Sequence, residues 1–194
     1  MFPEPIDAEK NLEFSLDNPN NELELIQMAI NGDTNVFKRL FDTNVSRIYA
    51  FCLRMSMNRE LAEEITQDVF VKAWEKLHTF RGESKFTSWL HSIAVNEFLM
   101  RKRSEKRYFK RFTTTDDIYQ FDRGTNGSES HYHSSIDLEK AISGLPEQAK
   151  AVFILHDIHG YQHKEIADMM NIEIGTTKAH LHRARKLLRE ELRK

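Results

Sequence analysis

Cysteine, long apolar runs and strand patterns are all scarce in this chain of 194 residues. Its single cysteine, Cys52, cannot form an internal disulfide and excludes zinc sites built from several cysteines, which fits a reducing compartment. No apolar run approaches the ~18 residues of a transmembrane helix. The N-terminus is acidic and has no basic start followed by an apolar core, so it does not resemble a secretory signal. We therefore expect a cytoplasmic protein.

Apolar residues instead recur at three- and four-residue steps, which is the spacing of amphipathic helices. No segment of weight predicts a strand, and no internal repeat is visible. The predicted helices cover about residues 22–31, 34–52, 59–78, 87–106, 136–143, 146–158, 163–170 and 174–192. The sequence therefore predicts an all-α fold.

A polar segment at residues 113–135 separates two groups of predicted helices. It contains two glycines and has no helical period, which is typical of a linker. The prediction is therefore two small helical domains joined by a flexible linker. A helical bundle is expected at 22–112 and a helix-turn-helix domain at 136–194. Residues 1–21 form an acidic N-terminal extension to which the sequence assigns no role.

The formal net charge of −2 conceals a strong segregation of charge along the chain. Residues 1–35 carry a net charge of −7 and residues 113–144 carry −4, whereas residues 101–112 carry +6 and residues 175–194 carry +5. Two compact positive blocks separated by an acidic segment suggest two contacts with one polyanion. The alternative is a pair of solvated helix ends, where the helix dipole favours basic residues.

The C-terminal segment 161–194 predicts two helices joined by a tight turn. Asn171 is expected to end the first helix, because asparagine tolerates the left-handed backbone conformation better than most residues with a side chain. The second helix has one apolar side and one strongly basic side. This arrangement is typical of a helix-turn-helix, which places a basic recognition helix in the major groove of DNA. A basic helix that only closes a helical bundle is the alternative.

Four sequence blocks, in order and spacing, resemble bacterial sigma factors and most closely the small extracytoplasmic-function (ECF) group. They are AEEITQDVFVKAWEKL (62–77), FRGESKFTSWLHSIAVNEFLMRKR (80–103), LPEQAKAVFILHDIHGYQHKEIADMMNI (145–172) and GTTKAHLHRARKLL (175–188). The resemblance implies an alternative sigma factor, not itself an enzyme and without a cofactor. Its partners would be core RNA polymerase, single-stranded −10 DNA at residues 22–112, duplex −35 DNA at residues 136–194, and an anti-sigma factor.

The resemblance also implies roles for individual side chains. Contact with core polymerase is expected from Glu63, Glu64, Gln67, Asp68 and Lys72. Contact with −10 DNA is expected from Arg81, Ser84, Lys85, Phe86, Asn96, Arg101 and Arg103. Contact with −35 DNA is expected from Thr177, Lys178, His182, Arg183, Arg185 and Lys186. Asn96 would offer its amide to an extruded base, because an amide both donates and accepts hydrogen bonds. Phe86 can equally be interpreted as a core residue.

Two other functions remain open on the residues alone. A transcription factor of the response-regulator type shares the Thr-x-Lys-x-His pattern at residues 176–180. Such proteins usually carry an α/β receiver or a ligand domain, and the helical N-terminal half argues against one. A metal-binding protein could use His156, His159 and His163, because spacings of three and four residues can place ligands on one helical face. Gly160 interrupts that helix, however, and no Glu-His catalytic motif accompanies the histidines.

Overall fold

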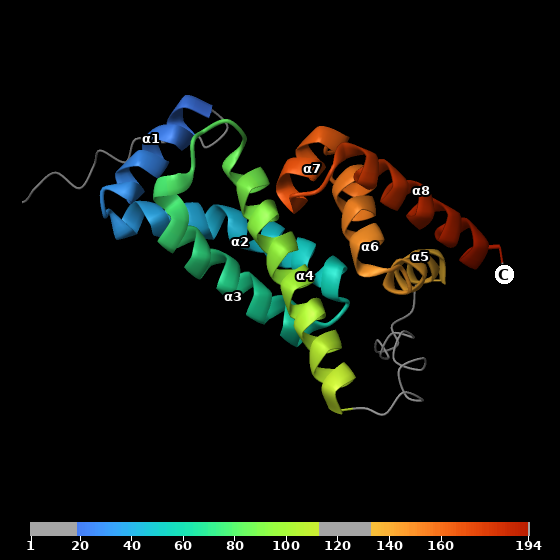
Figure 1. Ribbon diagram of the computed structural model, residues 1–194. Helices are drawn as coiled ribbons and strands as arrows, with labels where there is room; N and C mark the ends of the chain where they lie inside the picture. The colour runs from blue at the N-terminus through green and yellow to red at the C-terminus, as the bar shows by residue number, and fades with distance from the viewer. Residues whose placement is uncertain (1–18, 113–132, 194) are drawn as a thin grey trace, which may run out of the picture.

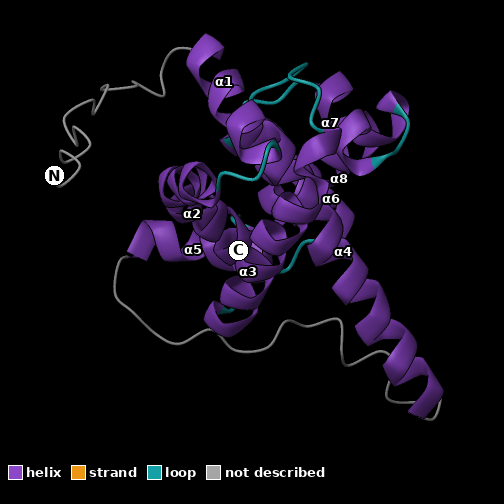
Figure 2. Ribbon diagram, turned by 90° about the vertical axis from the view of Figure 1, so that its left-hand side faces the viewer, coloured by secondary structure: helices purple, strands orange, loops and turns teal. Residues whose placement is uncertain are grey.

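The computed structural model describes residues 19–112 and 133–193, and every regular element within these ranges is helical. In chain order the helices are α1 (Pro19–Ile30), α2 (Thr34–Ser56), α3 (Arg59–Lys76), α4 (Phe86–Phe112), α5 (His133–Ser143), α6 (Glu147–Phe153), α7 (His163–Met170) and α8 (Ile174–Glu191) (Figures 1 and 2). A 3₁₀ turn, Leu77–Thr79, follows α3, and a π-helical segment, Ile154–Ile158, continues α6. The all-α prediction is confirmed.

Some of the predicted features fall outside this description. The acidic extension up to residue 18 and the linker from 113 to 132 lie outside the described residues. Among the described helices, none combines the length and the hydropathy of a membrane span. Because the described part of the chain contains no strand, the α/β receiver of a response regulator is not found there.

Helices α1 to α4 form the N-terminal unit, and side-chain caps define its turns. Asp33 begins α2 by accepting hydrogen bonds from the backbone N–H groups of Asn35 (3.0 Å) and Val36 (3.2 Å). Asn58 begins α3 in the same way and accepts a bond from the N–H of Leu61 at 2.8 Å. Both caps lie where the sequence predicts a helix start.

The apolar faces of α2, α3 and α4 meet in the core of the N-terminal unit. The largest buried side chains repeat at three- and four-residue steps, and they include Ile48, Phe51, Met55, Ile65, Val69, Leu90 and Phe98. Cys52 lies in the same core, where burial raises the pKa of its thiol to about 11. A large-to-small substitution in such a core costs about 2–5 kcal/mol, so the bundle is a rigid support for the side chains on its surface.

Two helix boundaries differ from the prediction. Helix α4 continues to Phe112 instead of ending near Lys106. Its last turns lack an apolar period, but half of their residues are Lys or Arg, which favour helix, and they contain no Gly or Pro. Helix α5 begins at His133 instead of residue 136. At the end of α4, helix propensity thus extends the element beyond the predicted apolar period.

Helices α5 to α8 form the C-terminal unit. Helix α6 packs along α8, and α7 packs against both α8 and the π-helical segment. Buried side chains from these elements include Ile142, Leu145, Val152, Ile154, Leu155, Ile166, Met170, Leu181, Ala184 and Leu188. Their spacing on α8 is three and four residues, which matches the apolar side that the sequence predicts for this helix.

The two units pack against each other along α4, and we call this contact the seam. Helix α7 and the start of α6 lie beside α4 in the ribbon view (Figure 1). Nδ1 of His91 lies 2.8 Å from the hydroxyl of Tyr161, and Nδ2 of Asn96 donates to the carbonyl oxygen of Met169 at 2.8 Å. The sequence predicts two domains but gives no sign of this docked arrangement, because the contacting residues are about 70 positions apart.

Candidate nucleic-acid interface

Helices α7 and α8 form a helix-turn-helix near the C-terminal end of the chain. Asn171 adopts the left-handed conformation (φ 51°), and the N–H of Ile172 donates to the carbonyl of Ala167 at 3.0 Å. At the start of α7, the N–H of Gln162 donates to the carboxylate of Glu165 at 2.7 Å. These bonds fix both ends of α7 and the short turn before α8. The sequence-based prediction of Asn171 as the turn residue is confirmed.

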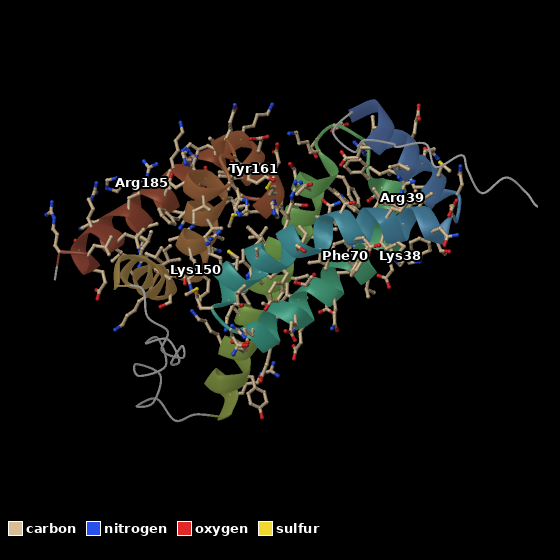
Figure 3. All side chains as sticks on the ribbon, turned by 180° about the vertical axis from the view of Figure 1, so that it is seen from behind. Lys38, Arg39, Phe70, Lys150, Tyr161 and Arg185 are labelled. Atoms are coloured by element: carbon tan, nitrogen blue, oxygen red, sulfur yellow. The ribbon has the colours of Figure 1, made fainter. Side chains whose placement is uncertain are left out.

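The outer face of α8 is basic and exposed. It carries Lys178, His182, Arg183 and Lys186, all of which are solvent-accessible. Figure 3 shows basic side chains extending away from α8 on this face. Four of the six side chains expected to contact duplex DNA therefore lie where a recognition helix needs them, since Lys and Arg can donate to guanine acceptors in the major groove.

The structure corrects the prediction for Thr177. This side chain is completely buried, and its hydroxyl donates to the carbonyl of Ile174 at 2.8 Å and lies 3.0 Å from Nδ1 of His163. Thr177 lies one helical turn before the buried Leu181, so it falls on the core side of α8. A side chain without exposed surface cannot contact DNA in this arrangement, and Thr177 instead holds α8 against α7.

Arg185 is anchored to the π-helical segment. Its Nε donates to Oδ2 of Asp157 at 2.9 Å and its Nη2 donates to Oδ1 at 2.6 Å. This two-bond contact lowers the pKa of the Asp157 carboxyl, and a hydrogen bond from His156 acts in the same direction. Arg185 remains half-exposed, so a phosphate would share or replace a partner that the guanidinium already has.

The loop before α4 presents three of the expected −10 residues, Arg81, Ser84 and Lys85, as exposed side chains. Helix α1 packs against this loop through the side chain of Leu23, which lies next to Gly82. Gly82 has φ +73°, and a Cβ atom at this position would lie only 2.7 Å from Cδ2 of Leu23. A residue with a side chain at position 82 would therefore need both a strained backbone and a shift of Leu23.

Phe86, also expected to contact DNA, is instead a core residue. It is 0 % exposed, stacks on Trp89 with ring centroids 5.6 Å apart, and meets Phe80 edge-on at 5.7 Å. Its position one turn before the buried Leu90 places it on the apolar side of α4. The DNA-contact prediction for Phe86 is thus corrected to the core interpretation, and the ring fixes the base of the loop.

Asn96 is exposed, but the docked arrangement occupies its donors. Nδ2 donates to the carbonyl of Ser92 at 2.7 Å and to the carbonyl of Met169 at 2.8 Å. An asparagine amide has two N–H donors, so both are in use. Arg103, about two turns further along α4, is exposed, and no ion pair is found for it within the described residues.

The outer face of α3 is divided between solvent and α4. Glu63 and Gln67 are exposed, and no ion pair is found for Glu63 among the described residues. The remaining residues expected to contact polymerase, Glu64, Asp68 and Lys72, face partners on α4. The surface that is free for a partner protein is therefore narrower than the sequence suggests.

A ladder of ion pairs joins α3 to α4. Arg101 donates from Nη1 to Glu64 at 2.6 Å and from Nη2 to Asp68 at 2.5 Å, and these contacts raise the pKa of its guanidinium. One step along the helices, Lys72 pairs with the buried Glu97. Arg101 was expected to contact DNA, and the structure places it in this ladder. The sequence could not reveal these pairs, because each joins residues at least 25 positions apart.

A buried group of histidines at the seam was not predicted. His91 lies 4.6 Å from the ring of Phe51 and 4.8 Å from the ring of His159. The Nε2 atoms of both histidines are buried and have no hydrogen-bond partner in the described structure. Burial, together with the nearby His159, lowers the pKa of His91 to about 3. Burial also lowers the pKa of His159, with a smaller contribution from the positive charge of Arg54.

The three histidines considered as metal ligands do not converge. The rings of His156 and His163 lie 4.7 Å apart, but His159 turns toward His91 on α4. Within residues 19–112 and 133–193, no three His, Cys, Asp or Glu side chains are placed to hold one metal ion. The metal-binding alternative therefore has no site in this part of the chain.

Two family models match the chain, in the order of its two units. The model described as Sigma-70 region 2 matches residues 40–108, from α2 to α4. The model described as Sigma-70, region 4, matches residues 135–188, from α5 to α8. Each match falls within one of the two units that the fold defines.

Individual proteins match over both units. The chain is 30% identical over 154 residues to the ECF RNA polymerase sigma factor SigE of Mycolicibacterium smegmatis, and the match covers 78% of this chain and 59% of that relative. It is 29% identical over 177 residues to the ECF RNA polymerase sigma factor SigW of Bacillus subtilis, with 87% and 95% covered. The chain thus spans less than two thirds of SigE but nearly all of SigW.

A solved structure has the same arrangement of helices. It is that of the sigma factor RpoE in complex with the anti-sigma factor NepR from Bartonella quintana, with a TM-score of 0.64 and 27% identity. The match covers 81% of this chain and 96% of that chain. A second structure, CnrH in complex with the cytosolic domain of CnrY, shares the fold at a TM-score of 0.60 and 20% identity.

Proposed function

The chain belongs to the sigma-70 family, in its ECF group, and we propose that its two units read the two elements of one promoter. It is an alternative sigma factor, a subunit that gives core RNA polymerase its promoter specificity. The observation that carries the division of labour is the coincidence of region 2 with the N-terminal bundle and of region 4 with the helix-turn-helix unit.

The N-terminal unit is proposed to read the single-stranded −10 element. A melted strand needs cationic and polar groups for its backbone and a donor–acceptor group for an extruded base. Arg81, Ser84 and Lys85 lie exposed on the loop, Arg103 lies exposed on α4, and Asn96 supplies the amide. Phe86 supports this surface from the core, and Arg101 supports it through its ion pairs with α3.

The C-terminal unit is proposed to read the duplex −35 element through α8. Lys178, His182 and Arg183 occupy the exposed side of this helix between its first turn and its middle and would face base edges. Lys186, one turn later, would contact phosphate and add to affinity without adding to sequence preference. Arg185 would serve mainly to position the helix through Asp157.

Reading both elements requires the seam to open. Both N–H donors of Asn96 are occupied in the docked arrangement, one of them by Met169 of the C-terminal unit. A base edge could receive that donor only after α7 moves away from α4. We therefore infer that the docked arrangement belongs to the chain free of promoter, and that the units separate when they bind the two elements.

Glu63 and Gln67 are proposed as the centre of the surface that binds core polymerase, since they are the exposed members of the expected set. The chain would act in the cytoplasm and carry no catalytic centre, because the polymerase performs the chemistry. An anti-sigma factor is proposed as a further partner, by analogy with RpoE and CnrH in their solved complexes.

Runoff transcription with purified core polymerase and genomic promoter fragments tests the proposed function. We expect discrete transcripts only when the chain is present. The double variant Glu63→Lys/Gln67→Lys should reduce co-purification of core, whereas the matched control Glu24→Lys, exposed on α1, should not. Strong binding of the free chain to duplex DNA, with no effect on transcription by core, would instead identify an ordinary repressor or activator.

A further inference from the structure

A cationic cleft lies at the end of the seam that is far from the loop before α4. Its walls come from α4, from the start of α6 and from α8, and it has a volume of about 280 Å³. Its ionisable lining residues are Lys102, Arg103, Lys106, Glu147, His180 and Arg183. Because α4 belongs to one unit and α6 and α8 belong to the other, the cleft exists only while the units are docked (Figure 1).

The positive charge of the cleft is not balanced by its own residues. Four side chains with permanent positive charge face a single carboxylate, Glu147, which pairs with Lys106 at 3.2 Å. Lys102 pairs with Glu105, outside the cleft. For Arg103 and Arg183, no ion pair is found within the described residues. Two guanidinium groups on opposite walls are thus left to a ligand or to solvent.

Neighbouring groups respond to this charge. The pKa of His180 is lowered by burial and further by the charge of Arg183. Lys150, on the buried side of α6 (labelled in Figure 3), has its pKa lowered by burial, while Glu147 acts to raise it and Lys102 acts to lower it further. Positive groups from both units are therefore close enough to disfavour each other, and an anion in the cleft would relieve that repulsion.

We propose that this cleft binds a small anion with two or more linked phosphate groups. Arginine side chains contact phosphate through two parallel N–H bonds, and lysines add point charges. The volume lies just below the roughly 300–1,000 Å³ of ordinary ligand pockets, which suits a short phosphate chain and excludes a DNA duplex. The apolar Leu99 and Pro146 complete the lining and leave room beside the phosphates.

Binding at this site would hold the two units together. A ligand that contacts only the docked arrangement shifts the equilibrium toward it, in proportion to its differential affinity. Since Arg103 and Arg183 are also proposed to contact promoter DNA, the ligand and the promoter would compete by reciprocal linkage. This consequence rests on the proposed function, whereas binding of the anion itself does not.

Inorganic tripolyphosphate is the probe, titrated into the full-length chain by calorimetry at constant ionic strength. Gln148 is exposed at the rim of the cleft, and Gln148→Glu adds a carboxylate there. We expect saturable binding to the wild type, and roughly ten-fold or weaker binding to Gln148→Glu because of like-charge repulsion. The matched control is Gln27→Glu, the same change at an exposed site on α1, which should bind like the wild type.

Equal weakening in both variants, or equal binding of sulfate, would show non-specific screening and overturn the proposal. Preference for single-stranded DNA over tripolyphosphate at the same residues would make the cleft a nucleic-acid site and overturn it as well. In runoff transcription, tripolyphosphate should inhibit the wild type more strongly than Gln148→Glu, each relative to its own level without the probe. If the probe binds but the chain supports no transcription, the proposed function fails and the anion site stands.

Discussion

The two ends of the seam differ in how they hold the units together. At one end, the buried His91 and Phe51 pack with the partly buried His159 and Tyr161 in an uncharged group. At the other end, the cleft between α4 and α8 brings together positive side chains from both units. The first end favours docking through burial, and the second opposes it through repulsion, so docking is conditional and responds to pH, salt and anions.

The largest effect should come from acid, which charges the neutral end. His91 has a pKa of about 3 in the fold and an ordinary value of 6.5, so the folded chain binds fewer protons between these values. The contribution of neutral His91 to the free energy of unfolding is fully present above pH 6.5 and is lost as the pH falls toward 3. From pH 6.5 to 4.5 the free energy of unfolding should drop by about 2.3 kcal/mol, because the slope approaches about 1.4 kcal/mol per pH unit only once the unfolded-state histidine is protonated.

Chemical denaturation at several pH values measures this slope. The variant His91→Gln, which can still bond Tyr161 but cannot gain charge, should lose most of it. His159 faces the same group and shifts in the same direction, so a smaller slope should remain. An unchanged slope in His91→Gln would mean that the seam histidine is not the titrating group.

At the charged end, replacing Arg183 should weaken binding to DNA and strengthen docking of the two units. Arg183→Ala is expected to lower use of the cognate −35 element by about 1–3 kcal/mol, because a base contact is lost. The same change removes one positive charge from the cleft, so docking of the free chain should become tighter. Lys178→Ala, which changes the same helix outside the cleft, should lower use of the −35 element without changing docking. Weaker docking in Arg183→Ala would refute the assignment of repulsion to this end.

A smaller effect is expected from the hydrogen bond at the neutral end. Tyr161→Phe removes the hydroxyl that lies 2.8 Å from His91 and 3.2 Å from Ser88, while it keeps the ring. Docking should weaken by about 1 kcal/mol, the usual net value of one hydrogen bond. The ratio of docked to open chain, measured by energy transfer between labels on the two units, reports this change. An effect on helicity instead of docking would place Tyr161 in the fold of its own unit.

Salt should produce the smallest effect, and it should act at the charged end alone. Exposed charges interact weakly and are screened above about 0.1 M salt, so added sodium chloride should favour docking by less than about 1 kcal/mol. The shift should shrink in Arg183→Gln, which has less repulsion to screen. If salt instead opened the seam, attractive ion pairs such as Lys106–Glu147 would dominate the cleft.

The helices and the surfaces of each unit could be predicted from sequence, because local rules determine them. Asn58, Asp33 and Asn171 end or begin helices through bonds to residues within five positions. The DNA roles of Thr177 and Phe86 came from the resemblance, whereas each residue lies one turn before a buried leucine and so falls on the apolar side of its helix.

The partners of ionic and polar side chains could not be predicted. Arg101 contacts Asp68 across 33 positions, and Asn96 contacts Met169 across 73. Nothing in the local pattern of either residue separates a free DNA contact from one that is already bonded. The histidines at 156, 159 and 163 were grouped by spacing, whereas the fold gives His159 to the seam and leaves the other two on the C-terminal unit.

The central claim is that the units read separate promoter elements and therefore part from each other. Energy transfer between labels at Lys38→Cys on α2 and Glu190→Cys on α8 tests it, since both sites are exposed and the buried Cys52, with its pKa raised to about 11, reacts poorly. In the docked arrangement Lys38 and helix α8 lie at opposite ends of the molecule (Figure 3), so we predict that long separation in the free chain and a clearly different one in the transcribing complex of chain, core polymerase and promoter. An unchanged distance in a complex that makes transcript would contradict the account.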